Sequence, residues 1–469
     1  MITQASSEYS ICIAVKSSDA DNAKKYIDQE FEFEINFGKV NPTKIENNMV
    51  NIAIVGDKMK DYQGISGKLF SSLGSNNINI RAIAQGASER NISIMIDKKN
   101  VEKALNTLHE SFFEAQIKEL NLFITGVGNV GKKLINQINQ QKNYLLKNLR
   151  LKINVMGLSN SKKMILSEEP ISLLEWENLL YEGEKADRDI YFDYIKSKNL
   201  RNSIFIDNTA SPIISKEYHK FLKNSIGVVT CNKIACADEL KNYKILKNVS
   251  RKFSSPFLFE TNVGAGLPII DTLNNLIASG DRIIKIQAIL SGSLNYIFNN
   301  FDNKSSFVNV VKKADELGFT EPDPSIDLSG IDVARKILIL ARESGYDLEI
   351  EDVKNDSFLP EKTKKAKSKK EFYQILKNNS NYFSGILNKA LEKNCKLKYV
   401  AELIDGKASV GLKHIDRNHD FYNLEGSDNI ILFFTNRYSE QPLIVKGAGA
   451  GGDVTAAGIF ADIIRIGKR

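Results

Sequence analysis

The chain has 469 residues, of which 42% are hydrophobic and 26% charged, and its formal net charge is +7. This is an ordinary globular balance, with enough length for about three domains. No run approaches the ~20 apolar residues of a membrane span and no charged leader precedes an apolar segment, so membrane insertion and secretion are not expected, and the cytoplasm is the expected compartment.

An internal repeat opens the chain. Residues 2–8 are similar to residues 83–89, and each copy is followed by an alternating strand, at 11–15 and 92–96. Around the second copy the pattern predicts a βαββα unit with strands at 50–55 and 78–84 and helices at 64–73 and 101–112. The first copy lacks its opening strand and helix, so an upstream segment has been lost, or the missing strand comes from elsewhere. Chance similarity of two short loops is the remaining alternative.

A buried strand at 122–124 runs into a glycine turn and then an amphipathic helix. The turn is Gly126-Val127-Gly128-Asn129-Val130-Gly131. The first glycine permits the tight turn, the second lets the backbone approach a pyrophosphate, and the third lets the helix pack closely on the strand. We interpret this stretch as a dinucleotide site, and a plain βα turn is the alternative.

The next strand, 152–158, ends at Ser159, Asn160, Ser161 and Lys162. An NAD site usually carries an acid here for the ribose 2′-hydroxyl. Hydroxyl and lysine side chains suit a 2′-phosphate better, which favours NADP over NAD. The alternative is a solvated turn.

Two further strands, 203–207 and 227–230, deliver Asn208-Thr209 and Lys233 at their carboxyl ends. Open parallel sheets bind ligands at this edge. Lys233 could hold a carbonyl oxygen or shuttle a proton there, or it could be a surface turn residue.

Residues 260–342 contain the remaining candidates. A turn with two glycines at 260–268 precedes a helix, and a rigid proline-rich loop at 318–324 carries carboxylates. In the helix at 332–340, Asp332 and Lys336 are four residues apart and share a face, which taken alone favours a surface salt bridge. The only basic block, 361–370, has no interleaved aromatic residue, so a solvated loop is expected and no nucleic-acid partner.

These stretches resemble homoserine dehydrogenase. The resemblance covers 120–469 and rests on Thr-Asn-Val-Gly-Ala-Gly-Leu-Pro, Leu-Ser-Gly-Ser-Leu-Asn-Tyr-Ile, Thr-Glu-Pro-Asp-Pro and Asp-Leu-Ser-Gly-Ile-Asp-Val-Ala-Arg-Lys. It implies proton transfer by two lysines, a substrate held by three carboxylates, a monovalent cation, expected to be sodium, and a C-terminal glycine segment near the nicotinamide. The two lysines would be Lys336 and Lys233, of which Lys233 would also contact the cofactor, and the three carboxylates would be Glu321, Asp327 and Asp332. The cation would be bound by Glu260 and the main chain of Val263, Ala265 and Leu267, and the glycine near the nicotinamide would be Gly451.

The N-terminal repeat resembles the ACT domain, a module that binds amino acids, as paired in bifunctional aspartokinase/homoserine dehydrogenases. The resemblance implies a threonine site at Gln4 and Gln85, because a side-chain amide can donate to and accept from a zwitterion. These 469 residues contain no kinase-sized segment, so aspartokinase activity is not expected of this chain.

The expected fold class is therefore α/β, with an α+β ACT-like region (1–118), a Rossmann-type doubly wound domain (119–263), an α/β substrate and dimerisation domain (264–440) and a segment (441–469) that returns to the nucleotide domain. The expected function is reversible NADPH-dependent reduction of L-aspartate 4-semialdehyde to L-homoserine by a homodimer or homotetramer. Two alternatives remain: a non-catalytic sensor of nucleotides and amino acids, and a remnant of a bifunctional enzyme. The four cysteines form no CxxC pair, so neither a disulfide framework nor a zinc site is expected.

Overall fold

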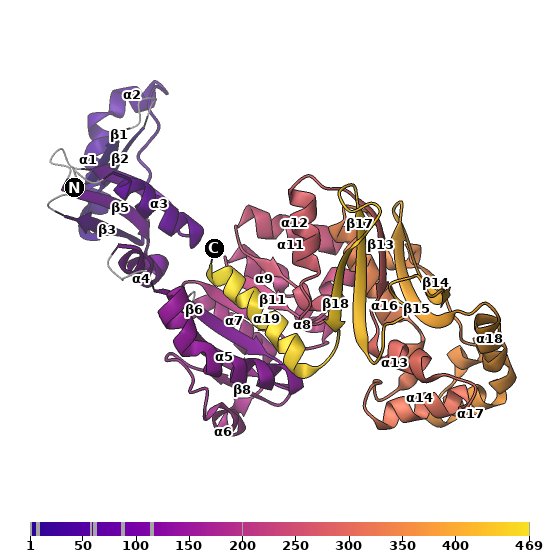
Figure 1. The fold of residues 1–469 in the computed structure, drawn as a ribbon. Coiled ribbons are helices and arrows are strands. Elements are labelled where there is room, and N and C mark those ends of the chain that lie inside the picture. Colours follow the sequence, from indigo (N-terminus) through magenta and orange to yellow (C-terminus); the bar gives the residue numbers. More distant parts are fainter. Residues whose placement is uncertain are drawn as a thin grey trace. The chain divides into compact units, whose positions relative to one another are not determined.

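The computed structural model describes residues 2–5, 10–56, 59, 63–85, 90–112, 117–198 and 200–468. The chain divides into two compact units (Figure 1). The first comprises Met1–Glu119 with Arg150–Lys152 and Ser197–Asn202, and the second comprises Leu120–Leu149, Ile153–Lys196 and Ser203–Arg469. Their sheets and helices confirm the predicted fold class.

The first unit contains a three-stranded antiparallel sheet with two helices packed on it. The strands pair in the order β3-β5-β4, and the elements are β3 (Met49–Val55), α3 (Ile65–Ser75), β4 (Ile80–Gln85), β5 (Asn91–Asp97) and α4 (Val101–Phe112). Ile92, Ile94 and Ile96 of β5 join Leu69 and Leu108 of the helices in one buried cluster. Period-two alternation on the strand and 3.6-residue periodicity on the helices produce this packing. The predicted βαββα unit is thus present.

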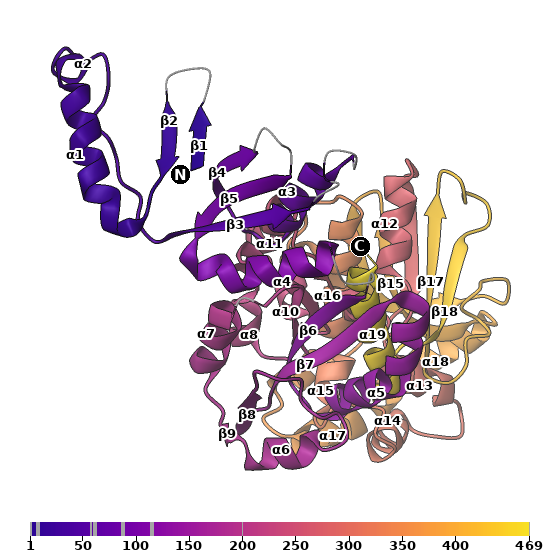
Figure 2. The same cartoon turned by 90° about the vertical axis from the view of Figure 1, so that its left-hand side faces the viewer.

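The first copy of the repeat is built differently (Figure 2). β1 (Ile2–Ala5) and β2 (Ile11–Ala14) pair antiparallel, and η1 (Ser17–Asp19), α1 (Ala20–Glu30) and α2 (Glu32–Asn36) follow. No residue of α1 or α2 is buried, and Ile11 of β2 is 73% exposed, whereas the equivalent Ile92 of β5 is 2% exposed. The reason is that β5 carries α3 and α4 on its apolar face. Residues 6–8 and 86–89 of the two motif copies lie outside the described residues.

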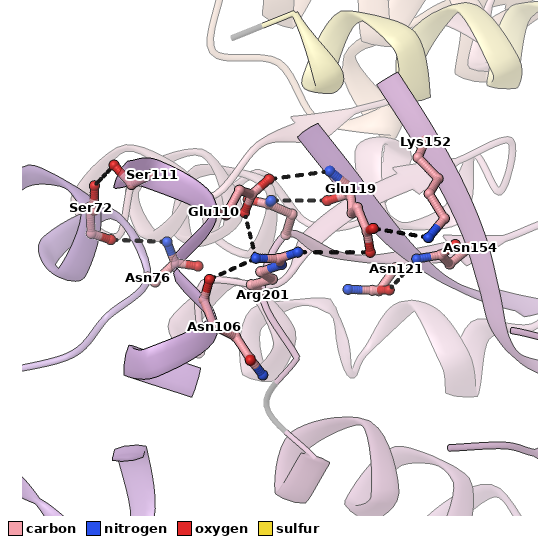
Figure 3. Close-up of polar contacts among 11 residues, drawn as sticks. Ser72, Asn76, Asn106, Glu110, Ser111, Glu119, Asn121, Lys152, Asn154 and Arg201 are labelled. Atoms are coloured by element: carbon pink, nitrogen blue, oxygen red, sulfur yellow. Dashed lines mark hydrogen bonds and ion pairs between the residues drawn. The ribbon is translucent and has the colours of Figure 1, made fainter. Parts of the chain in front are cut away.

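A cluster of charged residues connects α4 to the two short segments that complete the first unit (Figure 3). Arg201, whose side chain is 13% exposed, pairs with Glu110 of α4 at 3.2 Å and with Glu119 at 3.8 Å, and it donates to the carbonyl of Asn106 at 2.7 Å. Lys152 pairs with Glu119 at 2.9 Å. Because the central guanidinium is largely removed from water and has several partners, we expect this network to hold α4 more firmly than an exposed ion pair would.

The second unit begins with a seven-stranded sheet in the order β12-β11-β10-β6-β7-β8-β9. Strands β6, β10, β11 and β12 are parallel, with β12 at one edge, and β8 and β9 join antiparallel at the other edge. Most positions of β6, β7 and β10 are buried, as expected for strands covered on both faces. The elements are β6 (Lys118–Thr125), α5 (Asn129–Leu149), β7 (Leu151–Ser159), β8 (Lys163–Leu166), α6 (Trp176–Glu182), β9 (Glu184–Lys185), α7 (Arg188–Lys198), β10 (Ser203–Asp207), α8 (Pro212–Ser215), α9 (Tyr218–Lys223), β11 (Gly227–Thr230), α10 (Ile234–Ala237), α11 (Leu240–Lys252) and β12 (Phe257–Leu258).

A six-stranded sheet in the order β14-β16-β15-β13-β17-β18 forms the core of the following region. Its neighbours pair antiparallel except β14 with β16. Helices α13, α16 and α18 pack on this sheet. The elements are η4 (Glu260–Asn262), α12 (Ile270–Ala278), β13 (Ile283–Ile289), α13 (Gly292–Asn300), α14 (Phe307–Glu316), α15 (Pro324–Leu328), α16 (Ile331–Glu343), η5 (Ile350–Asp352), β14 (Lys354–Asp356), η6 (Glu361–Lys365), α17 (Lys369–Asn378), α18 (Ser380–Glu392), β15 (Lys396–Ile404), β16 (Lys407–Ile415), β17 (Asp428–Thr435) and β18 (Leu443–Ala448).

The basic block at 361–370 is only partly the loop that was predicted. η6 covers its start, and α17 begins at Lys369. Ser368 caps that helix by accepting a hydrogen bond from the main chain of Glu371, and Lys369 pairs with Asp315 at 2.6 Å. The capping residue and the ion pair therefore order a stretch that charge density alone marked as a loop.

After β18 the chain returns to the seven-stranded sheet as α19 (Gly452–Gly467), which packs on α5 (Figure 1). Gln137 of α5 donates to the carbonyl of Asp453 at 2.9 Å, and Ile459 and Ile463 are fully buried. The residues 443–448 that precede this return form β18, an edge strand of the six-stranded sheet. Among the described residues, no helix is both long enough and apolar enough to cross a membrane.

Candidate active site

The glycine turn between β6 and α5 needs glycine at two positions. Gly126 has φ +89°, and a Cβ there would lie 2.9 Å from the main chain of Asn208. A Cβ on Gly131 would lie 2.2 Å from the carbonyl oxygen of Gly126. A Cβ on Gly128 would meet nothing within 4 Å, so the backbone at that position is open to a ligand. This is the geometry that the dinucleotide motif predicts.

Replacing Gly131 with alanine is therefore expected to lower the thermal midpoint and weaken nucleotide binding. The new methyl group overlaps the Gly126 carbonyl, and overpacking of this kind costs about 1–3 kcal/mol. Thermal unfolding and a nucleotide fluorescence titration measure the two effects. Gly128→Ala is the matched control, because its methyl group enters open space and should leave the thermal midpoint unchanged. Wild-type stability and binding in Gly131→Ala would contradict this account of the turn.

The ends of β7 and β10 present the other predicted cofactor residues. Asn160 accepts main-chain hydrogen bonds from Lys162 and Lys163, both at 2.7 Å, and so shapes the turn itself, while Lys162 remains exposed. Both amide atoms of Asn208 are buried and lack a hydrogen-bond partner in the described structure. The Asn208 Nδ2 would be 3.3 Å from a Cβ on Gly131, so this amide lies against the glycine turn. An orphaned buried amide beside an open glycine turn fits a bound dinucleotide.

The C-terminal glycine segment reaches the same turn. Gly451 has φ +119° and precedes α19. A Cβ on Gly452 would lie 2.8 Å from the side-chain oxygen of Asn129, the first residue of α5. The structure therefore brings Gly451 close to the predicted cofactor residues. The hydrogen bond between Gln137 and Asp453, which are 316 positions apart, joins the same two segments.

Two lysines and an aspartate form the centre of the candidate site. Asp332 Oδ2 pairs with Lys336 Nζ at 2.9 Å, and Asp332 Oδ1 pairs with Lys233 Nζ at 3.2 Å. Lys336 is buried and also donates to the carbonyl of Leu290 at 2.6 Å. The sequence spacing alone favoured a surface salt bridge for Asp332 and Lys336, but burial of the ammonium excludes that interpretation.

The charges of this trio set its protonation. Burial lowers the pKa of Lys336, partly opposed by the charge of Asp332 and reinforced by that of Lys233. Burial acts against ionisation of Asp332, but the charges of Lys336 and Lys233 outweigh it and hold the pKa of Asp332 below its usual range. Asp332 therefore stays ionised between the two lysines, and Lys336 gives up its proton more readily than an ordinary lysine.

Asp327, at the end of α15, is the second carboxylate of the site. It accepts hydrogen bonds from the Ser293 hydroxyl and from the main-chain N–H of Glu321, both at 2.8 Å. Burial raises the pKa of Asp327, and these two hydrogen bonds oppose that rise. The charge of Asp327 in turn acts to raise the pKa of Lys336. Glu321 contributes its main chain to this contact, while its side chain is exposed. Sequence reasoning gave no role to Ser293 or to the Leu290 carbonyl, although both residues lie within the quoted Leu-Ser-Gly-Ser motif.

The predicted cation loop contains two kinds of candidate ligand oxygen, those of a carboxylate and those of main-chain carbonyls. The Glu260 carboxylate accepts main-chain hydrogen bonds from Ile269, Ile270 and Asp271 at 2.6–2.9 Å, so it caps α12. Its Oε2 also pairs with Arg465 at 3.6 Å. The main-chain carbonyls of Val263, Ala265 and Leu267 add further oxygens in a largely buried turn, in which Ala265 has φ +52°, and the Leu267 carbonyl also accepts a hydrogen bond from the main chain of Ile269 at 2.9 Å. Carbonyl and carboxylate oxygens of this kind fit a hard monovalent cation.

The two predicted regulatory glutamines lie on neighbouring strands of the first unit. Gln4 is opposite Cys12 in β1, and Gln85, which is exposed, ends β4. β1 and β4 are in contact. The side chain of Gln4 lies outside the described part of the chain, so the threonine site stays a prediction.

Comparison with known proteins identifies three regions. Residues 268–464 match the homoserine dehydrogenase model, residues 126–260 match the homoserine dehydrogenase NAD-binding domain, and residues 52–112 match an ACT domain. A bifunctional aspartokinase/homoserine dehydrogenase of Haemophilus influenzae is 40% identical over 99% of this chain, which spans 57% of that relative's length. A hyperthermophilic archaeal homoserine dehydrogenase in complex with NADPH shares the fold, with a TM-score of 0.59 and 24% identity over 75% of this chain and 98% of that one.

A shorter relative decides the family. The homoserine dehydrogenase of Schizosaccharomyces pombe is 39% identical over 358 residues, which is 74% of this chain and 95% of that enzyme. The match spans nearly the whole of that dehydrogenase, and so this chain belongs to the homoserine dehydrogenase family of oxidoreductases.

Proposed function

We propose that this chain catalyses the reversible reduction of L-aspartate 4-semialdehyde to L-homoserine with NADPH. The observation that carries the proposal is the Lys233–Asp332–Lys336 trio, in which a buried lysine with a lowered pKa shares a carboxylate with a second lysine. Reduction of an aldehyde builds negative charge on the carbonyl oxygen, so a cationic acid beside that oxygen accelerates the reaction.

In this mechanism the chain holds the substrate, excludes water and supplies the proton. When bound, reduced nicotinamide supplies the hydride. Lys336 gives a proton to the carbonyl oxygen, and its lowered pKa eases that transfer. Lys233 directs a second positive charge toward the same region, and Asp332 keeps the two ammonium groups together against their mutual repulsion. In the reverse direction neutral Lys336 accepts the hydroxyl proton of homoserine.

The α-ammonium group of the substrate is assigned to Glu321 and Asp327. Asp327 is fixed by Ser293 and by the main chain of Glu321, so an ionised oxygen can be held ready for a cation. The exposed side chain of Glu321 can add a second charge. With Asp332 these make three carboxylates beside two lysines, so the formal charge of the centre is −1 when both lysines are protonated, which favours binding of the substrate's ammonium group.

The preference for NADP over NAD rests on Ser161 and Lys162, which are exposed after β7 where an NAD site would carry an acid. Lys163 is less available, because its ammonium donates to the carbonyl of Gly183 at 2.7 Å. The likeness to an archaeal relative solved with NADPH supports the same choice.

A monovalent cation, sodium in this proposal, is assigned to Glu260, which also caps α12, and to the carbonyls of Val263, Ala265 and Leu267. When bound, it would rigidify the turn that leads into α12. Threonine binding at Gln4 and Gln85 belongs to the same proposal and rests on the contact between β1 and β4.

Assembly into a homodimer or homotetramer is also proposed. Ile284, Ile404 and Ile444, on three strands of the six-stranded sheet, are each at least 40% exposed. Apolar side chains gathered on one sheet are typical of a surface that another copy covers. Light scattering at several protein concentrations measures the assembly.

The test is the absorbance of reduced nicotinamide, followed with L-homoserine and either NADP or NAD, with and without threonine and sodium. Reduction of the cofactor, faster with NADP, is expected. A folded sample that binds nucleotide but reduces neither cofactor would overturn the proposal and favour a non-catalytic sensor. Equal rates with both cofactors would overturn the NADP preference alone.

A further inference from the structure

Helix α16 carries the candidate catalytic groups at one end and a buried arginine at the other. Asp332 and Lys336 lie in its first half, and Arg342 lies near its end. The Arg342 side chain has no exposed surface. It uses three nitrogens in four hydrogen bonds, three of which go to main-chain carbonyls, those of Leu348 (3.0 Å), Cys236 (2.9 Å) and Asp238 (2.7 Å), and the fourth to Glu349 (2.9 Å).

Two of these carbonyls belong to the segment that carries Lys233. Lys233 immediately precedes the short helix α10, and its carbonyl accepts hydrogen bonds from the main chain of Cys236 at 3.1 Å and Ala237 at 3.0 Å. Arg342 binds the opposite end of that turn. One rigid helical turn thus links the arginine to the main chain of Lys233.

The other side of the segment is anchored to the sheet. Asn232 donates to Asp207 and to the carbonyl of Ser211, both at 3.0 Å, and the main chain of Cys231 donates to the carbonyl of Asp207 at 3.1 Å. These contacts fix Lys233 relative to β10, but none of them involves α16. Within the described residues 234–238, the hydrogen bonds that reach α16 come from Arg342.

We propose that Arg342 is a positioning residue that holds the Lys233 turn against α16, so that Lys233 and Lys336 meet at Asp332. The assignment rests on the proposed function, in which both lysines serve the reaction. Lysine cannot replace arginine here, because a single ammonium cannot span three carbonyls and a carboxylate as the planar guanidinium does. The ring of Tyr243, 5.5 Å from the guanidinium carbon, restricts the plane further.

The test compares Arg342→Lys with Glu343→Gln in the full chain. Glu343 is the next residue on the helix and similarly buried, but its side chain contacts Tyr243, Lys247 and Asn274 instead of the Lys233 turn. Arg342→Lys should lower kcat by about tenfold or more with little change in KM for the nucleotide, since small misplacements of reacting groups are costly. Glu343→Gln should lower the thermal midpoint but keep kcat within about twofold of wild type.

A double variant separates positioning from general stability. If Arg342 acts through Lys233, adding Arg342→Lys to Lys233→Met should cause no further loss of kcat. Multiplicative losses, or wild-type kcat in Arg342→Lys, would overturn the proposal. If Arg342→Lys does not fold, Glu349→Gln removes one charged partner of the guanidinium and should lower kcat in the same direction by a smaller factor.

A readout independent of turnover distinguishes this proposal from the proposed function. NMR titration of the lysine side chains should show a higher pKa for Lys336 in Arg342→Lys, because the like charge of Lys233 moves away from it. An unchanged titration would overturn the positioning role. If the wild-type chain turns over no homoserine, the proposed function fails, and the titration still decides whether Arg342 places the two lysines.

Discussion

Replacing Lys336 with methionine is expected to lower turnover of homoserine by about 10²–10⁴-fold, the range typical of a lost general acid or base. Methionine fills nearly the same space without a charge. The fold should survive, because a buried ammonium that donates to one carbonyl and one carboxylate gives way to an apolar side chain. Nucleotide binding should persist, since the glycine turn and Asn208 are untouched. Steady-state kinetics, with thermal unfolding and a nucleotide titration on the same sample, measure all three.

Lys398→Met provides a matched control for that result. Lys398 is fully buried in the same unit, and its ammonium donates to Asn295, Asn299 and the carbonyl of Leu424. Burial lowers its pKa to about 8. Loss of this lysine should reduce stability without removing the proton donor. Turnover near the wild-type rate in Lys336→Met, or an equal loss of turnover in Lys398→Met, would refute the assigned role of Lys336.

Replacing Asp332 with asparagine is expected to have the second largest effect and to shift the pH profile. Asparagine keeps the size of the side chain but removes the charge that both lysines share. The two ammonium groups then repel each other without compensation, so the pKa of Lys336, already lowered by burial, falls further. We expect a loss of turnover of about 10²-fold at neutral pH, from misplaced lysines and from the changed protonation of Lys336.

The shift of the pH–rate profile in Asp332→Asn has a definite direction, which distinguishes it from a simple loss of activity. Reduction of the aldehyde needs protonated Lys336, so its rate falls as pH rises through the Lys336 pKa. With Asp332→Asn that decline should move to lower pH. Oxidation of homoserine needs neutral Lys336, so its rise with pH should also begin at lower pH. Rate profiles in both directions measure the shift, and profiles that keep the wild-type midpoints would show that Asp332 does not set this pKa.

Local patterns predicted much of the fold and part of the site. Four-residue spacing placed Asp332 and Lys336 on one face of a helix, and the strand-end rule placed Lys233 at the ligand edge of a parallel sheet. Spacing could not show that Lys336 is buried, because burial depends on β13, whose following residue Leu290 supplies a carbonyl 46 positions away. Arg342 was missed for the same reason, since its partner Cys236 is 106 positions distant.

The local sequence pattern also could not predict which side chains of the N-terminal repeat are exposed. Ile11 and Ile92 occupy equivalent positions in two similar alternating strands, yet one is exposed and the other is buried. The strands themselves are similar. What differs is the presence of α3 and α4 on β5, and alternation along a strand states only which face is apolar.

Helix α19 constrains the order in which the parts of the chain can fold during synthesis. It packs on α5 and its Asp462 accepts a hydrogen bond from the main chain of Glu260 at 3.1 Å, yet it follows the whole six-stranded sheet in the chain. During synthesis, β6 to β12 must therefore wait, with the apolar surface for α19 uncovered, until the intervening region has emerged. Such delayed closure makes folding slow and leaves the waiting sheet prone to association with other nascent chains. Chaperone demand during translation should accordingly fall on the nucleotide-binding half of the molecule.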